Sequence, residues 1–407
     1  MPRVAVGLQR PRRRAGAHRR LVVRGHGRAL TMTSAQRRVP ASMRWLAALH
    51  QAEVVLAWSL PEWQRVLRLS RRLRLLGRLA EQVEAAGLMD RLPPPVVNPL
   101  RAELQFSRWR TNQMRWTVER VSATLSDVTH PLVLLKGAAY AGLGLPIARG
   151  RLPSDLDILV PQAHLAEVQA RLVAAGWVEA ELDAHDQRYY REWSHEVPPM
   201  RHPVLPLELD LHHNILPPVA RVSVPAAPLL ARLQPSKWQG WQVLHPADQL
   251  LHSAVHLFHD SEARDRLRDL VDMDGLVRHF GPTVPDFWPA LLSRAQELKL
   301  SEDLALACHF LQAWLDTPIP EAVGATLAQG RRSRHRWLLP LWATVLHPTE
   351  PDREPGLGQS LAAGVVLVRH HLGRMPLRLL IPHLFHKARA QRAKAAQALI
   401  ADTPSDD

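Results

Sequence analysis

The feature that most constrains the fold is one stretch, residues 131–216, in which short apolar strands alternate with short helices. From residue 43 onward, most of the remaining chain repeats leucine, tryptophan and valine at spacings of three and four, which is typical of helices. The stretch predicts strands over 133–136, 155–160 and 207–212, a candidate strand over 177–182, and helices from 137 and over 164–175. We therefore expect an α+β fold, a small mixed-sheet core embedded between helical N- and C-terminal regions.

Changes in composition predict five segments. They are a basic disordered tail (1–42), an N-terminal helical region (43–125), the α/β core (126–216), a helical domain (217–346) and a basic helical C-terminal region (347–407). Pro93–Pro95 is expected to divide the N-terminal helices, because proline ends helices. Met32 and Met43 lie in or just after the tail, so a misassigned start is an alternative explanation for that tail.

The charge of the chain is concentrated at its ends. Its 52 Lys and Arg against 38 Asp and Glu give a formal net charge of +14. Residues 1–38 hold eleven arginines and no acid, residues 360–400 hold seven basic residues and no acid, and the last seven residues hold three aspartates, which leaves −1 for residues 39–359. A nucleic-acid or membrane-surface binder acting through the basic termini is therefore one hypothesis, although solvated ends are expected instead.

Several protein classes are excluded by absent signals. The single cysteine, Cys308, excludes an intramolecular disulfide and a cysteine-based zinc cluster, and it is expected to pack in a helix. No apolar run approaches the roughly 18 residues of a transmembrane helix, and the arginine-rich start lacks the apolar stretch of a secretory signal. We expect a cytoplasmic enzyme or binding protein.

Candidate metal ligands occur on the second predicted strand. Because alternate residues of a strand project to the same face, Asp155 and Asp157 are expected side by side, with Leu156 and Ile158 on the opposite face. Two neighbouring carboxylates repel each other unless a cation lies between them. A hard divalent cation with oxygen ligands, Mg²⁺ or Mn²⁺, is the expected partner. A surface strand that begins with a turn aspartate and carries one solvated aspartate is the alternative.

The third predicted strand carries further carboxylates. Its sequence alternates strictly, so Glu208, Asp210 and His212 share one face. If this strand pairs beside the second, Asp210 becomes a third metal ligand, with Glu208 as the alternate third carboxylate. Three carboxylates on two adjacent strands can hold two divalent ions for in-line nucleotidyl transfer.

These motifs resemble a known superfamily. The run Leu-Leu-Lys-Gly-Ala-Ala at 134–139, then Arg-Leu-Pro-Ser-Asp-Leu-Asp-Ile-Leu-Val-Pro at 151–161 and Glu-Leu-Asp-Leu-His-His at 208–213, is similar to nucleotidyltransferases related to DNA polymerase beta. The closest resemblance is to the branch of uncharacterised nucleotidyltransferases, over about residues 130–215. It implies a nucleoside triphosphate (NTP) donor, Mg²⁺ or Mn²⁺, and transfer of a nucleotidyl group to an acceptor that the sequence does not identify.

The resemblance also implies site residues. Gly137 would be the turn glycine that holds the nucleotide phosphates, Asp155 and Asp157 the metal pair and catalytic residues, and Asp210 the third carboxylate. Lys136 and Arg151 are then candidate phosphate contacts, although Lys136 could instead cap the end of a strand.

Ala138 also falls in the nucleotide-binding turn, where the superfamily has serine or glycine. The missing hydroxyl group keeps open a catalytically silent nucleotide- or partner-binding protein on the same fold.

A histidine cluster offers a competing site. His252 and His256 lie one helical turn apart and His259 follows, a spacing that metal ligands can have. The neighbouring apolar residues predict an ordinary packed helix, so we expect these histidines to be structural.

Overall fold

The computed structural model describes residues 40–329 and 335–382 of the 407-residue chain. Most of the predicted basic tail (1–42) and the last part of the basic C-terminal region therefore lie outside the described residues. Residues 39–407 belong to a single unit that contains every element described below. The boundaries of the five predicted segments stay predictions.

The N-terminal helices are bounded by residues with clear local reasons. At the start of the second helix, the Glu62 carboxylate accepts hydrogen bonds from the Ser59 backbone N–H and hydroxyl, both at 2.8 Å. Pro94 opens the long fourth helix, and proline is well suited to a first helical position because it has no N–H and an N–H there would have no intrahelical partner. The predicted interruption at Pro93–Pro95 is thus confirmed. The helices are α1 (Ala41–His50), α2 (Leu60–Arg72), α3 (Leu76–Ala85) and α4 (Pro94–Thr124).

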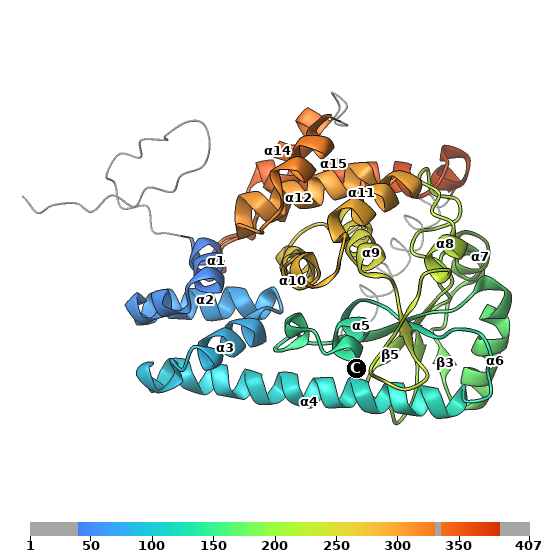
Figure 1. Ribbon diagram of the computed structural model, residues 1–407, viewed down its shortest axis with the longest axis horizontal. Coiled ribbons are helices and arrows are strands. Elements are labelled where there is room, and N and C mark those ends of the chain that lie inside the picture. The colour runs from blue at the N-terminus through green and yellow to red at the C-terminus, as the bar shows by residue number, and fades with distance from the viewer. Residues whose placement is uncertain (1–39, 330–334, 383–407) are drawn as a thin grey trace, which may run out of the picture. The chain divides into compact units, whose positions relative to one another are not determined.

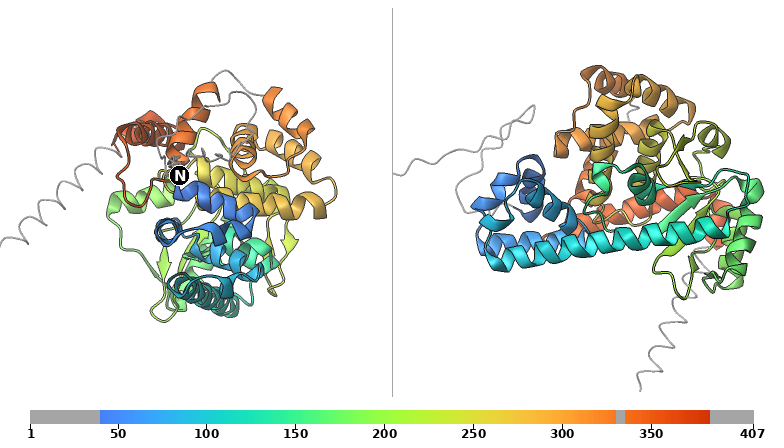
Figure 2. Two further views of the ribbon diagram at one scale, coloured as in Figure 1. Left: turned by 90° about the vertical axis from the view of Figure 1, so that its left-hand side faces the viewer. Right: turned by 60° about the horizontal axis from the view of Figure 1, so that its bottom comes forward.

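Helix α4 spans 31 residues, and α3 packs along it (Figures 1 and 2). A mixed seven-stranded sheet follows, in the order β3-β4-β5-β2-β1-β7-β6. Its strands are β1 (Val133–Leu134), β2 (Asp155–Leu159), β3 (Val178–Glu179), β4 (Met200–Arg201), β5 (Glu208–His212), β6 (Gln234–Pro235) and β7 (Gln242–Val243). Helices α5 (Lys136–Leu143), α6 (Leu165–Ala174), α7 (Ala184–Trp193) and α8 (Ala226–Leu230) connect them. The predicted α+β fold class is confirmed.

The sheet extends further along the chain than the sequence predicted. Residues from 217 onward were expected to be helical, but they contribute β7, which pairs in parallel with β1, and β6, which pairs with β7. The strand β4 was also not predicted. Each of these strands has only two residues, which is too short for an alternating pattern to be visible in the sequence.

The remaining helices pack around α9, which lies next to the sheet (Figure 1) and buries almost all of its residues. Within the described residues, no helix has both the length and the hydropathy of a membrane span. Cys308 is buried in α12, as expected. The helices are α9 (Pro246–Phe258), α10 (Leu267–Thr283), α11 (Phe287–Glu297), α12 (Ser301–Leu315), α13 (Glu321–Gln329), α14 (His335–Leu346) and α15 (Leu357–Arg374).

A buried ion pair joins α9 to α11. Arg294 donates from Nε to Asp248 Oδ1 at 2.6 Å and from Nη2 to Asp248 Oδ2 at 3.1 Å, and both side chains are almost fully buried. Removing one partner leaves an uncompensated buried charge. We therefore expect Arg294→Met to lower the free energy of unfolding by about 3–5 kcal/mol in urea denaturation.

The control is the exposed pair Arg115–Glu119, where Arg115→Met is expected to cost about 1 kcal/mol or less. The double variant Arg294→Met/Asp248→Leu should recover much of the loss, because it leaves no buried charge. A cost for Arg294→Met no larger than that of Arg115→Met would show that the buried pair does not stabilise the packing of α9 against α11.

Candidate active site

The turn between β1 and α5 has an unusual backbone. Lys136, the first residue of α5, has a φ of +44°, a left-handed conformation that costs a residue with a side chain roughly 1–2 kcal/mol. Its side chain is largely buried, and Nζ donates to Asp157 Oδ1 at 2.7 Å. Lys136 thus begins the helix and pairs with the centre of β2. The alternative role, a cap on a solvated strand end, does not fit this placement.

Gly137 is required by the close approach of Arg151. A β-carbon at this position would lie 2.1 Å from Arg151 Nη1 and 2.9 Å from Cζ. The guanidinium cannot easily move away, because Nε donates to Asp272 Oδ2 at 2.9 Å and the group lies over the Tyr140 ring. Burial alone would lower the pKa of Arg151, but the carboxylate of Asp272 raises it above its ordinary value. Arg151 therefore connects the turn to α10.

The two acidic strands pair with each other, which was the condition for Asp210 to join the other two aspartates. β2 and β5 run in parallel, with Asp155 opposite Glu208 and Asp157 opposite Asp210. Directly opposite residues of a parallel pair project to the same face. The four carboxyl groups therefore lie on one face of the sheet, as the alternation of both strands predicted.

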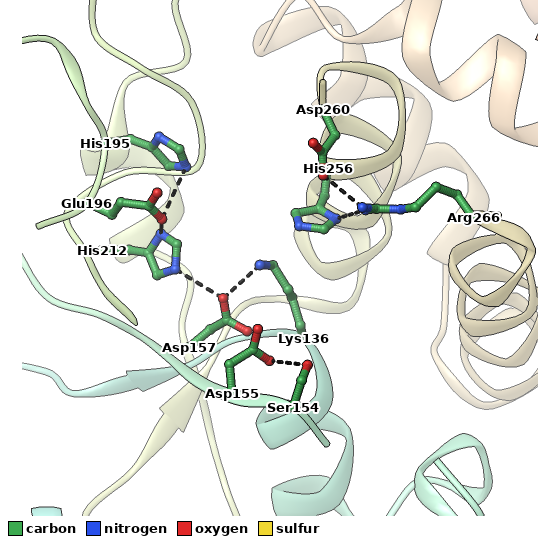
Figure 3. A network of polar contacts seen from close by, with 10 residues as sticks. All are labelled: Lys136, Ser154, Asp155, Asp157, His195, Glu196, His212, His256, Asp260 and Arg266. Carbon is green, nitrogen blue, oxygen red and sulfur yellow. Dashed lines mark hydrogen bonds and ion pairs between the residues drawn. The ribbon is translucent and has the colours of Figure 1, made fainter. Parts of the chain in front are cut away.

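The negative charge of Asp157 is stabilised by two hydrogen-bond donors. Lys136 Nζ lies 2.7 Å and His212 Nε2 3.1 Å from its Oδ1 atom (Figure 3). Burial would raise the pKa of Asp157, but these two partners hold it well below its ordinary value. In the same way, burial would lower the pKa of Lys136 and of His212, and Asp157 raises both. Asp157 is thus ionised and Lys136 protonated at neutral pH.

Asp210 is in the opposite situation. Burial, and then the negative charge of Asp157, raise its pKa to about 7. Within the described residues Asp210 makes no ion pair, whereas Glu208 pairs with Arg201 at 2.9 Å. Asp155 accepts a hydrogen bond from Ser154 Oγ at 2.9 Å. Three carboxylates therefore converge with too few cations for their charge, which is the donor chemistry that suits a hard divalent ion.

Two adjoining cavities open beside Lys136; Asp155 and Asp157 line one of them, and Asp210 lines neither. One, of about 60 Å³, is lined by Asp155, Asp157, Lys136, Arg151 and other residues. Its lining includes Arg268, which the sequence reasoning did not select. In the part of the chain that the structure describes, Arg268 Nη1 is buried without a hydrogen-bond partner. The only sequence signal for Arg268 was its place in the run 267–272 on α10, which resembles the C-terminal helices of the nucleotidyltransferase branch.

The second cavity, of about 200 Å³, shares Lys136 and His256 with the first. His252 and His259 also line it, so the histidine cluster both packs and borders the site. His256 Nδ1 lies 2.8 Å from Arg266 Nη2, and His259 Nε2 lies 2.9 Å from Asp303 Oδ1. His256 and His259 thus have different partners, and the histidine cluster does not form one set of metal ligands.

His195 and Glu196 line the same cavity and were also not predicted. They come from the segment before β4, next to the end of β5, and lie beside His212 (Figure 3). The pair stands in an irregular stretch with no periodic pattern, so the only sequence signal was two adjacent residues that can both bind metals.

The sheet is mixed, and two of its adjacent strands carry an Asp-x-Asp pair and a third aspartate. A strand-to-helix turn with Lys136 and Gly137 lies next to them. This combination is typical of a nucleotidyltransferase-type fold. The profile of a family described as uncharacterised nucleotidyltransferase matches residues 59–316. The chain belongs to this family, and the predicted family membership is confirmed. The match also includes helices on both sides of the 130–215 region where the resemblance was seen. No functionally curated protein and no solved structure matches the sequence.

The tight contact at Gly137 predicts a sharp local effect. Gly137→Ala places a methyl group against the fixed Arg151 guanidinium, so we expect the free energy of unfolding to fall by about 1–3 kcal/mol. The control is Gly324→Ala in α13, where a β-carbon would meet nothing within 4 Å; it should raise stability by about 0.5–1 kcal/mol. Equal effects of the two variants in urea denaturation would contradict the packing argument.

The crowded charge at Asp210 predicts a pH-dependent gain in stability. Its pKa is about 7 in the folded chain against an ordinary 3.8, so stability falls as the pH rises between these values. Asp210→Asn removes this cost. In EDTA we expect the variant to exceed wild type by about 1–2 kcal/mol at pH 8, with the difference vanishing near pH 4.

The control is Glu208→Gln, on the same strand and face but paired with Arg201. It should change the free energy of unfolding little at either pH, because the pair is partly exposed. An Asp210→Asn variant no more stable than wild type at pH 8 would show that Asp210 carries no such electrostatic strain.

Proposed function

We propose that this protein transfers a nucleotidyl group from an NTP to an acceptor hydroxyl, with Asp155, Asp157 and Asp210 as the catalytic carboxylates. The single observation that carries the proposal is the register of β2 and β5, which puts the Asp-x-Asp pair and Asp210 on one face. The acceptor class stays open between a small molecule, a sugar, a peptide and a protein, and which NTP is used is also open.

The donor set fits divalent metal ions. The three aspartates offer oxygen ligands with excess negative charge, so they would hold Mg²⁺ or Mn²⁺. Glu208 is the weaker candidate for the third carboxylate, because Arg201 already pairs with it. When bound, such ions would neutralise the triphosphate and lower the pKa of the attacking hydroxyl.

The surrounding cations give this site a place for phosphates. Lys136 and Arg268 line the smaller cavity together with Asp155 and Asp157, and the unpartnered Nη1 of Arg268 is available to donate to a phosphate oxygen. Arg151 lines the same cavity and stays a candidate phosphate contact, with its guanidinium held by Asp272 and the Tyr140 ring. In the reaction, the acceptor oxygen bonds to the α-phosphorus as the bond to pyrophosphate breaks. The hydroxyl proton passes to Asp210 or to solvent.

A catalytically silent nucleotide- or partner-binding protein is the second candidate. It is favoured by Ala138, which is buried and offers no hydroxyl to a phosphate. The third hypothesis, binding of nucleic acid or a membrane surface by the basic termini, concerns segments that lie largely outside the described residues. A cytoplasmic location also stays a prediction.

Asp155→Asn tests the proposal. We expect it to keep the fold and to reduce Mg²⁺-dependent pyrophosphate release from NTPs, with candidate acceptors present, by at least about 100-fold, because a metal-binding carboxylate is lost. Isothermal titration with a non-hydrolysable NTP analogue should show loss of Mg²⁺-dependent binding as well. The matched control is Glu208→Gln, which faces Asp155 across the strand pair and should keep activity within about threefold of wild type.

Turnover of Asp155→Asn at the wild-type rate would overturn the assignment. Metal-dependent nucleotide binding without pyrophosphate release in wild type, across the acceptors tried, would favour the silent binder.

A further inference from the structure

We infer that His195, Glu196 and His212 form a second metal site, selective for a borderline ion such as Zn²⁺ and separate from the aspartate site proposed above. Two imidazoles and one carboxylate are the ligand set of several three-ligand zinc centres, which leave one coordination position open. A hard ion such as Mg²⁺ prefers oxygen ligands alone.

The backbone fixes the three residues beside one another. Glu196 forms an antiparallel bridge with His212, the last residue of β5. On either side, Val197 N–H donates to Leu211 O at 3.0 Å and His213 N–H donates to His195 O at 2.8 Å. The ligands therefore stand on paired backbone and not on a free loop, which is the preorganisation that a metal site needs.

The hydrogen-bond pattern of His212 leaves one nitrogen directed at Glu196. Its Nε2 lies 3.1 Å from Asp157 Oδ1, and because a carboxylate only accepts, Nε2 carries the hydrogen. Its Nδ1 lies 3.3 Å from Glu196 Oε2, yet this buried nitrogen has no hydrogen bond in the described residues. A nitrogen lone pair facing a carboxylate is unfavourable, so the gap between Nδ1 and Glu196 suits a cation, either a proton on Nδ1 or a metal ion.

A metal ion suits this arrangement in two further ways. His195 Nε2 lies 3.9 Å from Glu196 Oε2, and the three ligand atoms lie within 4.8 Å of one another. Ligand atoms of a tetrahedral zinc lie about 3.4 Å apart, so a shift of roughly 1 Å by the His195 ring would close the site. The Nε2–H of His212 then donates to Asp157, which is the carboxylate–histidine–metal arrangement of many zinc sites.

The position of the site gives the ion a role. All three ligands line the larger cavity together with Lys136 and His256. An open coordination position there would accept an oxygen or nitrogen atom of a second substrate. The ion would also fix the hydrogen of His212 on Nε2 and thereby the bond that positions Asp157. The zinc site thus predicts an acceptor with a metal-binding polar group next to its reacting hydroxyl.

Another three-residue group offers a matched control. His130, His164 and Glu167 also bring their ligand atoms within 4.8 Å of one another. However, the two rings stack with centroids 4.3 Å apart, and Arg171 pairs with Glu167 at 3.0 Å. Stacked rings direct their nitrogens alongside each other and not toward a shared ion, so this group should not bind zinc tightly.

The experiment measures bound metal in untagged full-length protein, loaded with Zn²⁺ in excess Mg²⁺ and then desalted. Elemental analysis should find about one zinc per chain in wild type, in Asp155→Asn and in His164→Ala. Glu196→Gln and His195→Ala should bind zinc roughly 100-fold more weakly. Co²⁺ in place of zinc should give the strong visible absorption of a four-coordinate nitrogen–oxygen site in wild type, which tests the site even if one ligand variant fails to fold.

Wild type without stoichiometric zinc and without the Co²⁺ absorption would overturn the inference. Unchanged zinc binding in a folded Glu196→Gln variant would also overturn it. The same holds if His164→Ala loses zinc while Glu196→Gln and His195→Ala keep it. Loss of zinc in Asp155→Asn would assign the metal to the aspartates instead. Because the readout is bound metal, failure of nucleotidyl transfer leaves this result unaffected.

Discussion

The buried negative charge of Asp157 is the interaction on which the rest of the site depends. A carboxylate that is only 4% exposed loses several kcal/mol of hydration, and it persists as an ion only where cations or hydrogen-bond donors replace the lost water. Here Lys136 approaches from the turn after β1, on one side of β2, and His212 approaches from β5, on the other side. The strand order β5-β2-β1 therefore places a hydrogen-bond donor on each side of the carboxylate.

This requirement explains the strained turn after β1. Lys136 accepts a left-handed φ because that backbone directs its ammonium group to Asp157. The next residue must then be glycine, since Arg151 fills the space of a β-carbon and is itself held by Asp272 on α10. A chain of contacts thus runs from the centre of the sheet to the C-terminal helices, and these helices complete both cavities. The family match over residues 59–316 includes this chain of contacts, whereas α15, which also lines the larger cavity, lies beyond the match.

The sequence predicted the parts of the site that follow from local periodicity. The pairing of β2 with β5 was only a condition, which the structure meets. Alternation within each strand was enough to place Asp155 beside Asp157 and Asp210 beside Glu208, because the pleat repeats every two residues. It was not enough to show that Arg151 supports the turn or that Arg268 lines the cavity, since those contacts join residues more than 100 positions apart. Glu196 lies in an irregular segment, and β7 has only two residues, so neither segment has a hydrophobic periodicity that the sequence could reveal.

The net charge of the chain is positive, whereas the charge of the site is negative. The overall charge of +14 arises at the termini, whereas carboxylates outnumber cations on the shared face of β2 and β5. This excess of negative charge contributes to the raised pKa of Asp210. Such a surface repels a free triphosphate and attracts small cations. A nucleotide can therefore reach these aspartates only together with ions that neutralise both partners. Under the proposed function, metal binding is then a condition of substrate binding as well as of chemistry, and a protein with this site would discriminate against metal-free nucleotides before any bond is broken.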